Sequence, residues 1–337
     1  MYKKSFFKGL LALMSLAFMT IGCNKNDVAV YEEIVAVTNR GGASVSLFNA
    51  TNNQLINTIP ISGSEPMYVV YVPVKDKLYV GDRAGKKVHI INPTTKVIES
   101  SITVGSGVFH MWADGNGKEL WVNNDVDNTI SVINLTSNTV SKTINVGMKP
   151  HDVFLTKDGT KAYVSVLNSD PNIQDKVYMY SVSNYTKIGE VNVGKDPHLY
   201  HLSNSNKLYV PCQSGQVYTL NGNDLSVIAN KSFVGAHGIF ASPDQSNLFV
   251  TNISGNQIYS INASTSDING AAINTPSTTP HNVVLNEAGN KIFITHSGAT
   301  STAVTTYTVN SATLTAASTI TAGLNPFGLT YYKRKSN

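Results

Sequence analysis

The sequence predicts an all-β protein, a seven-bladed β-propeller with four antiparallel strands in each blade. Two observations predict this fold. One strand pattern recurs seven times along the chain, and the two ends of the repeating region hold complementary parts of a single blade. Four short strands in a repeat of about forty residues are typical of propeller blades.

The recurring strand is rich in β-branched and aromatic residues, as a buried strand should be. Its most regular copies read Leu-Tyr-Val or Leu-Phe-Val, followed by small or polar residues. The seven copies are Ile34–Asn39, Leu78–Asp82, Leu120–Asn124, Ala162–Val166, Leu208–Cys212, Leu248–Asn252 and Ile292–His296.

Three further strands accompany each copy. One follows it directly, as in Lys87–Asn92, and the next ends at a turn glycine, as in Ile102–Gly105. The fourth strand precedes each copy. Its openings are Pro66-Met67, Phe109-His110, Pro150-His151, Pro197-His198, Ala236-His237, Pro280-His281 and Pro326-Phe327.

The ends of the repeat predict how the ring closes. The first copy starts at Ile34 with no strand before it, whereas Phe327–Tyr332 is a first strand with nothing after it. We therefore expect the C-terminal strand to pair with the N-terminal blade. A β-sandwich would not explain so regular a repeat, and a solenoid would need distinct capping units. The propeller is expected over residues 34–333.

The N-terminus resembles a bacterial lipoprotein signal. Lys3, Lys4 and Lys8 precede an apolar stretch that is too short to span a bilayer comfortably, and Ile21-Gly22-Cys23 resembles a lipobox. That resemblance implies a signal peptide over 1–22, lipidation of Cys23 and a linker over 23–33. An ordinary secretory signal with an incidental cysteine is the alternative. We expect an outer-membrane lipoprotein, lipid-anchored and facing either the periplasm or the cell exterior.

Composition narrows the classes of partner. The net charge is +4, but Lys and Arg are scattered and form no basic tract, which argues against nucleic-acid binding. After Cys23 the chain has one cysteine, Cys212, so no intrachain disulfide is expected. We expect a monomeric propeller.

Histidines open five successive blades. Because the first strand of a propeller blade is innermost, these side chains should converge at one mouth of the central channel. Met67 and Phe327 occupy the place in the other two blades, and the opposite face shows no comparable concentration of polar groups. The five residues are His110, His151, His198, His237 and His281.

A second, wider tier is expected around this mouth, because the recurring strand runs back to the same face. Its last residues are Asn39, Asp82, Asn124, Val166, Cys212, Asn252 and His296. Cys212 has the simpler interpretation of a small buried hydrophobic residue. His89 is expected to be exposed on an outer strand, and His201 to be packed and hydrogen-bonded.

Neutral imidazole is a common protein ligand for copper and zinc. The histidine cluster therefore predicts capture of a metal ion or of a metal-containing cofactor. The alternative is structural, with each imidazole hydrogen-bonded to the backbone of a neighbouring blade.

From Ile34 to Tyr332 the repeat resembles the YVTN and YncE-like propeller family. The resemblance is specific for the fold. Some YncE-like lipoproteins of Bacteroidetes-type bacteria capture corrinoids for a partner transporter, so the resemblance implies a haem or corrinoid ligand. Trp112, Tyr200 and Phe109 would pack beside such a macrocycle, and an outer-membrane transporter or complex would be the partner.

Enzyme motifs are missing from the sequence: it has no Gly-x-Ser-x-Gly, no His-Glu-x-x-His and no phosphate-binding glycine loop. The carboxylates expected near the histidines are Asp82, Asp125, Asp152 and Asp196. His151 and Asp152 are adjacent, and adjacent strand residues point to opposite sides, so they are not expected to act together. A binding protein is favoured, with an interaction scaffold and a lactonase-like enzyme as alternatives.

Overall fold

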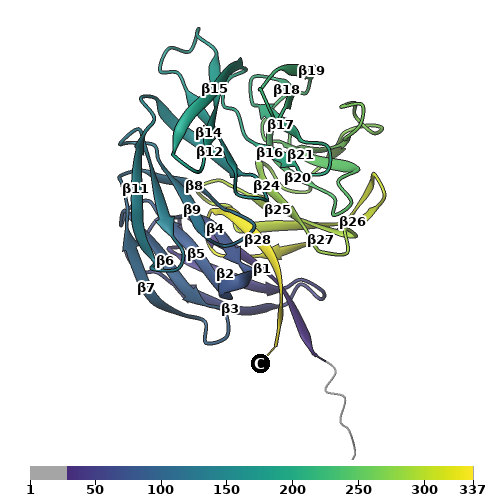
Figure 1. Ribbon diagram of the computed structural model, residues 1–337. Helices are drawn as coiled ribbons and strands as arrows, with labels where there is room; N and C mark the ends of the chain where they lie inside the picture. The colour runs from purple at the N-terminus through teal and green to yellow at the C-terminus, as the bar shows by residue number, and fades with distance from the viewer. Residues whose placement is uncertain (1–28, 337) are drawn as a thin grey trace, which may run out of the picture.

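A computed structural model of the chain describes residues 29–336, and these residues form seven four-stranded sheets arranged in a ring (Figure 1). The predicted fold class is therefore confirmed. Cys23 and the signal segment lie outside the described residues. Within 29–336 no helix is both long and apolar enough to cross a membrane.

Each blade is an antiparallel meander whose strands run outward from the centre. The innermost strands are β4 (Pro66–Val72), β8 (Val108–Ala113), β12 (Lys149–Leu155), β16 (Tyr200–Leu202), β20 (Ala236–Ala241), β24 (Pro280–Leu285) and β28 (Pro326–Lys335). The second strands, which carry the recurring pattern, are β1 (Tyr31–Asn39), β5 (Lys77–Asp82), β9 (Glu119–Asn124), β13 (Lys161–Leu167), β17 (Lys207–Cys212), β21 (Asn247–Asn252) and β25 (Lys291–His296).

The outer half of each blade is more exposed. The third strands are β2 (Ser44–Asn49), β6 (Lys87–Asn92), β10 (Thr129–Asn134), β14 (Asp175–Ser181), β18 (Gln216–Asn221), β22 (Gln257–Asn262) and β26 (Ala303–Asn310). The outermost strands are β3 (Leu55–Pro60), β7 (Val97–Thr103), β11 (Thr139–Asn145), β15 (Thr186–Val193), β19 (Val227–Ser232), β23 (Ile273–Asn274) and β27 (Thr313–Thr321). A short 3₁₀ turn, η1 (Pro73–Lys75), joins β4 to β5.

The ring closes as predicted. In Figure 1 the C-terminal β28 (yellow) lies beside the N-terminal β1 (purple), and the two pair from Tyr31 opposite Lys335 to Asn39 opposite Pro326. Arg334 on β28 binds Asp76 at 2.8 Å and also contacts Glu32. One blade is thus built from both ends of the chain, and its strands extend slightly beyond the expected limits of 34 and 333.

The core lies between the blades, where both faces of each second strand are covered. Tyr79, Trp121, Tyr163 and Tyr209 on these strands are at most 1% exposed. Burial on both faces explains why the recurring strand is nearly all apolar, whereas the outermost strands β7 and β11 are mostly exposed and have one buried residue each. The blades therefore hold the innermost strands rigidly around the central axis.

Candidate functional site

A β-bulge near the start of the innermost strand sets which side chains face the centre. In six blades, two residues of this strand stand opposite one residue of the second strand, which shifts every later side chain by one position. The six pairs are Met67-Tyr68, Phe109-His110, His151-Asp152, His237-Gly238, His281-Asn282 and Phe327-Gly328.

A hydroxyl in the recurring strand holds the bulge. Thr251 Oγ1 accepts the N–H of Gly238 at 2.9 Å and donates to the carbonyl of His281 in the next blade, also at 2.9 Å. Thr38 and Thr295 do the same in their blades. The threonine of the repeat therefore fixes both the bulge and the contact between neighbouring blades.

One blade lacks the bulge. Pro211 takes the place of the threonine on β17. The strand pairing is regular there, with Pro197 opposite Cys212 and the N–H of His198 donating to the carbonyl of Pro211 at 2.8 Å. His198 thus stands alone at the level where the other blades present two residues.

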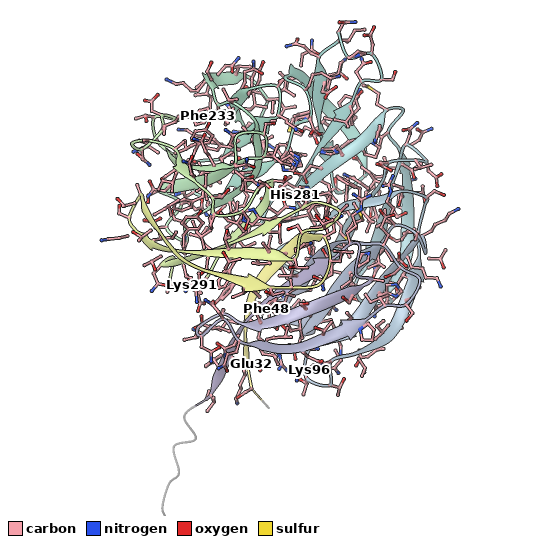
Figure 2. The ribbon with its side chains drawn as sticks, turned by 180° about the vertical axis from the view of Figure 1, so that it is seen from behind. Glu32, Phe48, Lys96, Phe233, His281 and Lys291 are labelled. Carbon is pink, nitrogen blue, oxygen red and sulfur yellow. The ribbon has the colours of Figure 1, made fainter. Side chains whose placement is uncertain are left out.

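The first bulge residues and His198 form what we call the imidazole ring: Met67, Phe109, His151, His198, His237, His281 and Phe327. Neighbouring aromatic rings contact one another around the axis, with centroids 3.9 Å apart for His198–His237, 4.6 Å for His237–His281, and 4.0 Å for His281–Phe327. Six of the seven side chains are buried. The expected mouth is therefore closed by stacked side chains, and Figure 2 places His281 near the middle of the molecule.

His110 does not belong to this ring, contrary to our expectation. Its neighbour Phe109 occupies the first bulge position and packs on His151 with centroids 4.9 Å apart. His110 takes the second position, one level deeper, where its ring lies 3.8 Å from that of Tyr68. Val108 pairs with Asn124 as Pro150 pairs with Val166, so Phe109, and not His110, is the residue equivalent to His151.

Asp152 lies between His110 and the imidazole ring. Its Oδ1 is 2.6 Å from Nδ1 of His110, and its Oδ2 is 3.6 Å from Nδ1 of His198. The carboxylate also accepts the N–H groups of Leu199 and Val153. Burial alone would raise the pKa of Asp152, but the facing His110 and His198 imidazoles hold it below its ordinary value.

His151 and Asp152 do act on one residue, so the expectation that they would not cooperate is wrong. His151 Nε2 lies 3.3 Å from Nε2 of His198, while Asp152 approaches the other nitrogen of the same imidazole. The bulge removes the strict alternation of a regular strand, which allows both side chains to reach His198.

Asp196 completes the cluster from the loop before β16. Its Oδ1 lies 2.9 Å from Nε2 of His151, and its side chain is 30% exposed. Burial would raise the pKa of Asp196, but the contact with His151 lowers it. His151, Asp196 and His198 offer ligand atoms close enough to share one metal ion, and so do His110, Asp152 and His198.

The other two histidines are bonded to backbone. His237 Nδ1 lies 3.3 Å from the carbonyl of His281, and His281 Nδ1 lies 3.3 Å from that of Phe327. Burial lowers the pKa of His281 to about 3, so both contacts use a neutral imidazole. His237 and His281 therefore match the structural alternative considered from the sequence.

The three asparagines of the expected wider tier hold their own blades together. The amide of Asn39 donates to Ser44 and Ser46, that of Asn124 to Ser131, and that of Asn252 to Tyr259. Asn39 also accepts the N–H of Gly323, and Asn252 that of Gly255. The asparagine of the repeat ties strand ends to loops and does not reach the imidazole ring.

The remaining members of the wider tier are likewise engaged. His296 contacts the carbonyl of Thr278 and the hydroxyl of Thr305. Cys212 is fully buried, which raises the pKa of its thiol and agrees with the interpretation of a small hydrophobic residue. Asp82 accepts the N–H groups of Glu65 and Gly85.

Of the predictions for the two remaining histidines, His89 and His201, one is wrong and one is confirmed. His89 is buried and contacts Asp82 at 3.2 Å and Ser101 at 2.8 Å, so the expectation that it would be exposed is wrong. Asp82, at the end of β5, makes its contact with His89 across the β5–β6 pair. His201 is buried and bonded to Asn206, as expected.

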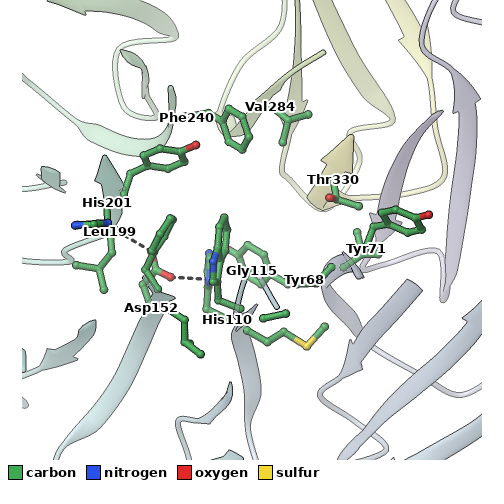
Figure 3. Close-up of a pocket in the computed structure, with 18 of the residues that line it drawn as sticks. Tyr68, Tyr71, His110, Gly115, Asp152, Leu199, His201, Phe240, Val284 and Thr330 are labelled. Atoms are coloured by element: carbon green, nitrogen blue, oxygen red, sulfur yellow. Dashed lines mark hydrogen bonds and ion pairs between the residues drawn. The ribbon is translucent and has the colours of Figure 1, made fainter. Parts of the chain in front are cut away.

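A cavity of about 420 Å³ lies on the far side of the imidazole ring. Its deep end is lined by Tyr68, His110, Asp152, His198 and Asn282, and its outer end by the turns between first and second strands. Figure 3 places Phe240, Val284 and Thr330 across this cavity from the Asp152–His110 pair. The site predictions made from the sequence concerned the histidine mouth and did not include this cavity.

The cavity wall comes from one position per blade, two or three residues after the imidazole ring. Four consecutive blades present aromatic rings, of which Trp112 and Phe154 stack with centroids 4.1 Å apart. The seven residues are Val70, Trp112, Phe154, Tyr200, Phe240, Val284 and Thr330. Phe154 and Phe240 were not predicted as site residues from the sequence. They could have been found from their places opposite Tyr163 and Phe249, the aromatic residues of the recurring strand.

No family model matches the sequence, and no curated protein matches it either. Among solved structures, the chain is similar to the periplasmic gluconolactonase of Pseudomonas aeruginosa, with 16% identity, a TM-score of 0.73, and coverage of 90% of this chain and 99% of that one. A putative 6-phosphogluconolactonase from Bacteroides fragilis gives 15%, 0.70, 89% and 98%. Hydrazine synthase from Kuenenia stuttgartiensis gives 14%, 0.66, 86% and 92%. At these identities the likeness establishes the propeller fold alone.

Proposed function

We propose that the protein binds a first-row transition-metal ion, Zn²⁺ or Cu²⁺, through His151, His198 and Asp196. The observation that carries the proposal is the approach of the two Nε2 atoms to 3.3 Å, with the Asp196 carboxylate 2.9 Å from one of them. At usual zinc–ligand lengths, two ligands at the tetrahedral angle lie roughly 3.4 Å apart. Two imidazoles and a carboxylate also suit these ions chemically.

The contact between Asp152 and His198 supports the same assignment. The Asp152 carboxylate lies 3.6 Å from Nδ1 of His198, and its negative charge favours a proton on that nitrogen, which leaves the Nε2 lone pair facing His151. A metal-bound histidine is commonly held by a carboxylate in this way, which fixes its tautomer and orientation. Asp152 would therefore orient the ligand without touching the ion.

The burial of the ring favours an ion over a haem or corrinoid. His151 and His198 are 8% and 2% exposed, and the stacked rings around them leave neither of these two imidazoles projecting toward a flat macrocycle. Asp196, at the surface end of the cluster, offers a route by which a small ion can enter. The lipobox-like sequence Ile21-Gly22-Cys23 supports capture in the cell envelope, at the outer membrane, with a transporter as the recipient.

Metal analysis and calorimetry on the untagged chain test the proposal. We expect one Zn²⁺ or Cu²⁺ per chain, and a loss of affinity of about 100-fold or more in His198→Ala, because an outer-shell change alone costs about 10–100-fold. His281→Phe is the matched control, since it removes a neighbouring imidazole that lies outside the proposed set. Equal affinity in His198→Ala and the native chain would refute the assignment.

Lactone hydrolysis is the second candidate. It is favoured by the Asp152–His110 pair at the deep end of the cavity, an arrangement suited to a general base. Two of the structurally similar proteins are named as a gluconolactonase and a putative 6-phosphogluconolactonase. We rank this second because a polyhydroxylated lactone needs a polar partner for each buried hydroxyl, whereas the wall is mainly aromatic and aliphatic. Hydrolysis of glucono-δ-lactone that is lost in His110→Ala would reverse the ranking.

A further inference from the structure

The cavity beyond the imidazole ring is a second site, which shares with the proposed metal site only the ligand His198 and its neighbour Asp152. We propose that it binds a flat, largely apolar aromatic molecule that carries one hydroxyl or N–H donor, and that this donor bonds to Nε2 of His110. The proposal rests on the shape of the wall, the acceptor that His110 offers at the deep end, and a rim that is already formed.

The size and place of the cavity suit a small molecule. Its volume of about 420 Å³ falls in the range of roughly 300–1,000 Å³ that small-molecule sites occupy. It extends along the central axis from the level of His110 to the exposed turn residue Lys157. A ligand would therefore enter from the face opposite Asp196.

The wall is flat on one side and open on the other. Trp112, Phe154, Tyr200 and Phe240 form a continuous arc, with Tyr200 centred 5.2 Å from both Phe154 and Phe240. The other three blades carry Val70, Val284 and Thr330 at the same position. These side chains are smaller, so the cavity lies between them and the aromatic arc. Offset or edge-on contact with an aromatic arc favours a planar aromatic ligand.

The deep end offers Nε2 of His110 as an acceptor. The Asp152 carboxylate, 2.6 Å from Nδ1 of His110, favours the proton on that nitrogen and so leaves a lone pair on Nε2. Asp152 itself is occupied by the N–H groups of Leu199 and Val153. The amide nitrogen of Asn282 contacts the hydroxyl of Tyr68, the carbonyl of Phe327 and Nδ1 of His281. A ligand with one donor matches this arrangement.

The rim of the cavity is cross-linked between blades. The amide of Gln245 donates to Ser203 at 3.0 Å and accepts the N–H of Asn204 at 3.0 Å. A Cβ on Gly115 would lie 2.4 Å from the carbonyl of Lys157, so these two turns already touch. A rim held in this way keeps the cavity formed before a ligand arrives, which lowers the ordering cost of binding.

Calorimetry with 2-naphthol and 2-methoxynaphthalene in the presence of a chelator tests the site independently of metal binding. We expect 2-naphthol to bind with 1:1 stoichiometry, and the methoxy compound, which lacks the donor, to bind about tenfold more weakly. Thr330→Phe places an aromatic ring where four other blades already have one and fills the cavity, so it should weaken 2-naphthol binding at least about tenfold. Val97→Phe, on the exposed face of β7, is the matched control and should bind as the native chain does.

His110→Phe tests the acceptor directly, and in it the two compounds should bind equally well. The proposal is overturned if 2-naphthol gives no binding heat, or if Thr330→Phe binds it as tightly as Val97→Phe does. Unequal binding that persists in His110→Phe would show that the methyl group, and not the lost donor, causes the difference, and would overturn the role given to Nε2. Loss of zinc binding alone leaves these results unchanged, so the two proposals fail separately.

Discussion

Asp152 Oδ1 lies 2.6 Å from His110 Nδ1, and the two residues belong to neighbouring blades. The other oxygen of the same carboxylate faces His198, which contacts His151 and through it Asp196. One buried carboxylate therefore stands between the proposed metal site on one side of the imidazole ring and the cavity on the other.

Asp152→Asn should affect both sites and the fold. We expect a loss of metal affinity of about 10–100-fold, because Asp152 would no longer orient His198. The free energy of unfolding should fall by about 1–3 kcal/mol, because the amide satisfies the surrounding donors less well. Calorimetry and urea unfolding measure the two effects. Asp224→Asn, in an exposed turn, should change neither, and an Asp152→Asn protein that binds metal normally would contradict the role proposed for this carboxylate.

His281 should make stability depend on pH. Its pKa is about 3 in the folded protein and about 6.5 in an unfolded chain, so between these values the unfolded state binds the extra proton. Stability is then fully present above pH 6.5 and falls as the pH drops, by about 1.4 kcal/mol per pH unit from this group. His281→Phe, which copies the residue found in two other blades, should flatten the dependence. Urea unfolding between pH 4 and 7 checks this, and parallel curves for the two proteins would contradict it.

Gly238→Ala should destabilise the protein through the bulge. A Cβ at this position would lie 2.3 Å from the carbonyl oxygen of His281, which is backbone and has no freedom to turn away. We expect a loss of about 1–3 kcal/mol in the free energy of unfolding. Gly189→Ala is the control, because its Cβ meets only the flexible end of Met179 at 3.2 Å. Similar urea midpoints for the two variants would show that the bulge tolerates the added carbon.

Cys23→Ser should move the protein from the membrane to the soluble fraction. The expectation rests on the lipobox-like sequence Ile21-Gly22-Cys23, since stable anchoring takes more than one acyl chain and all would depend on this cysteine. Fractionation of cells that express each form, with immunoblotting, measures the change. Cys212→Ser is the matched control, and a Cys23→Ser protein that still sediments with membranes would argue for a different anchor.

The fold was predictable because its signals are local and repeated. Each copy of the recurring strand has the composition of a strand buried on both faces, and the missing first strand before Ile34 matched the extra one after Pro326. The convergence of His151, His198, His237 and His281 followed from the position of the innermost strand in any propeller. Neither inference needed knowledge of side-chain packing.

The details of the site depended on features that strand patterns do not carry. Val108 holds the place of Pro150, so Phe109 and not His110 is equivalent to His151, and the bulge makes Asp152 the neighbour of His198. The bulge is absent on β16, where the N–H of His198 bonds to the carbonyl of Pro211. The cavity exists because Val70, Val284 and Thr330 are smaller than Phe240, which holds the same position in its own blade. This equivalence is visible only when the blades are aligned by their strand pairing, and not by their sequence motifs.

The N–H of Gly328 bonds to Oγ1 of Thr38, which is 290 positions away in the chain. Closing a loop of that length costs about 5 kcal/mol in chain entropy, apart from a constant term, and a fold with such distant contacts has a high contact order and forms slowly. The strand that closes the loop also supplies Phe327 to the imidazole ring and Thr330 to the cavity wall. We infer that ligand binding is the last property the folding chain acquires, and a chain that stops before Pro326 should contain all five histidines and bind neither zinc nor 2-naphthol.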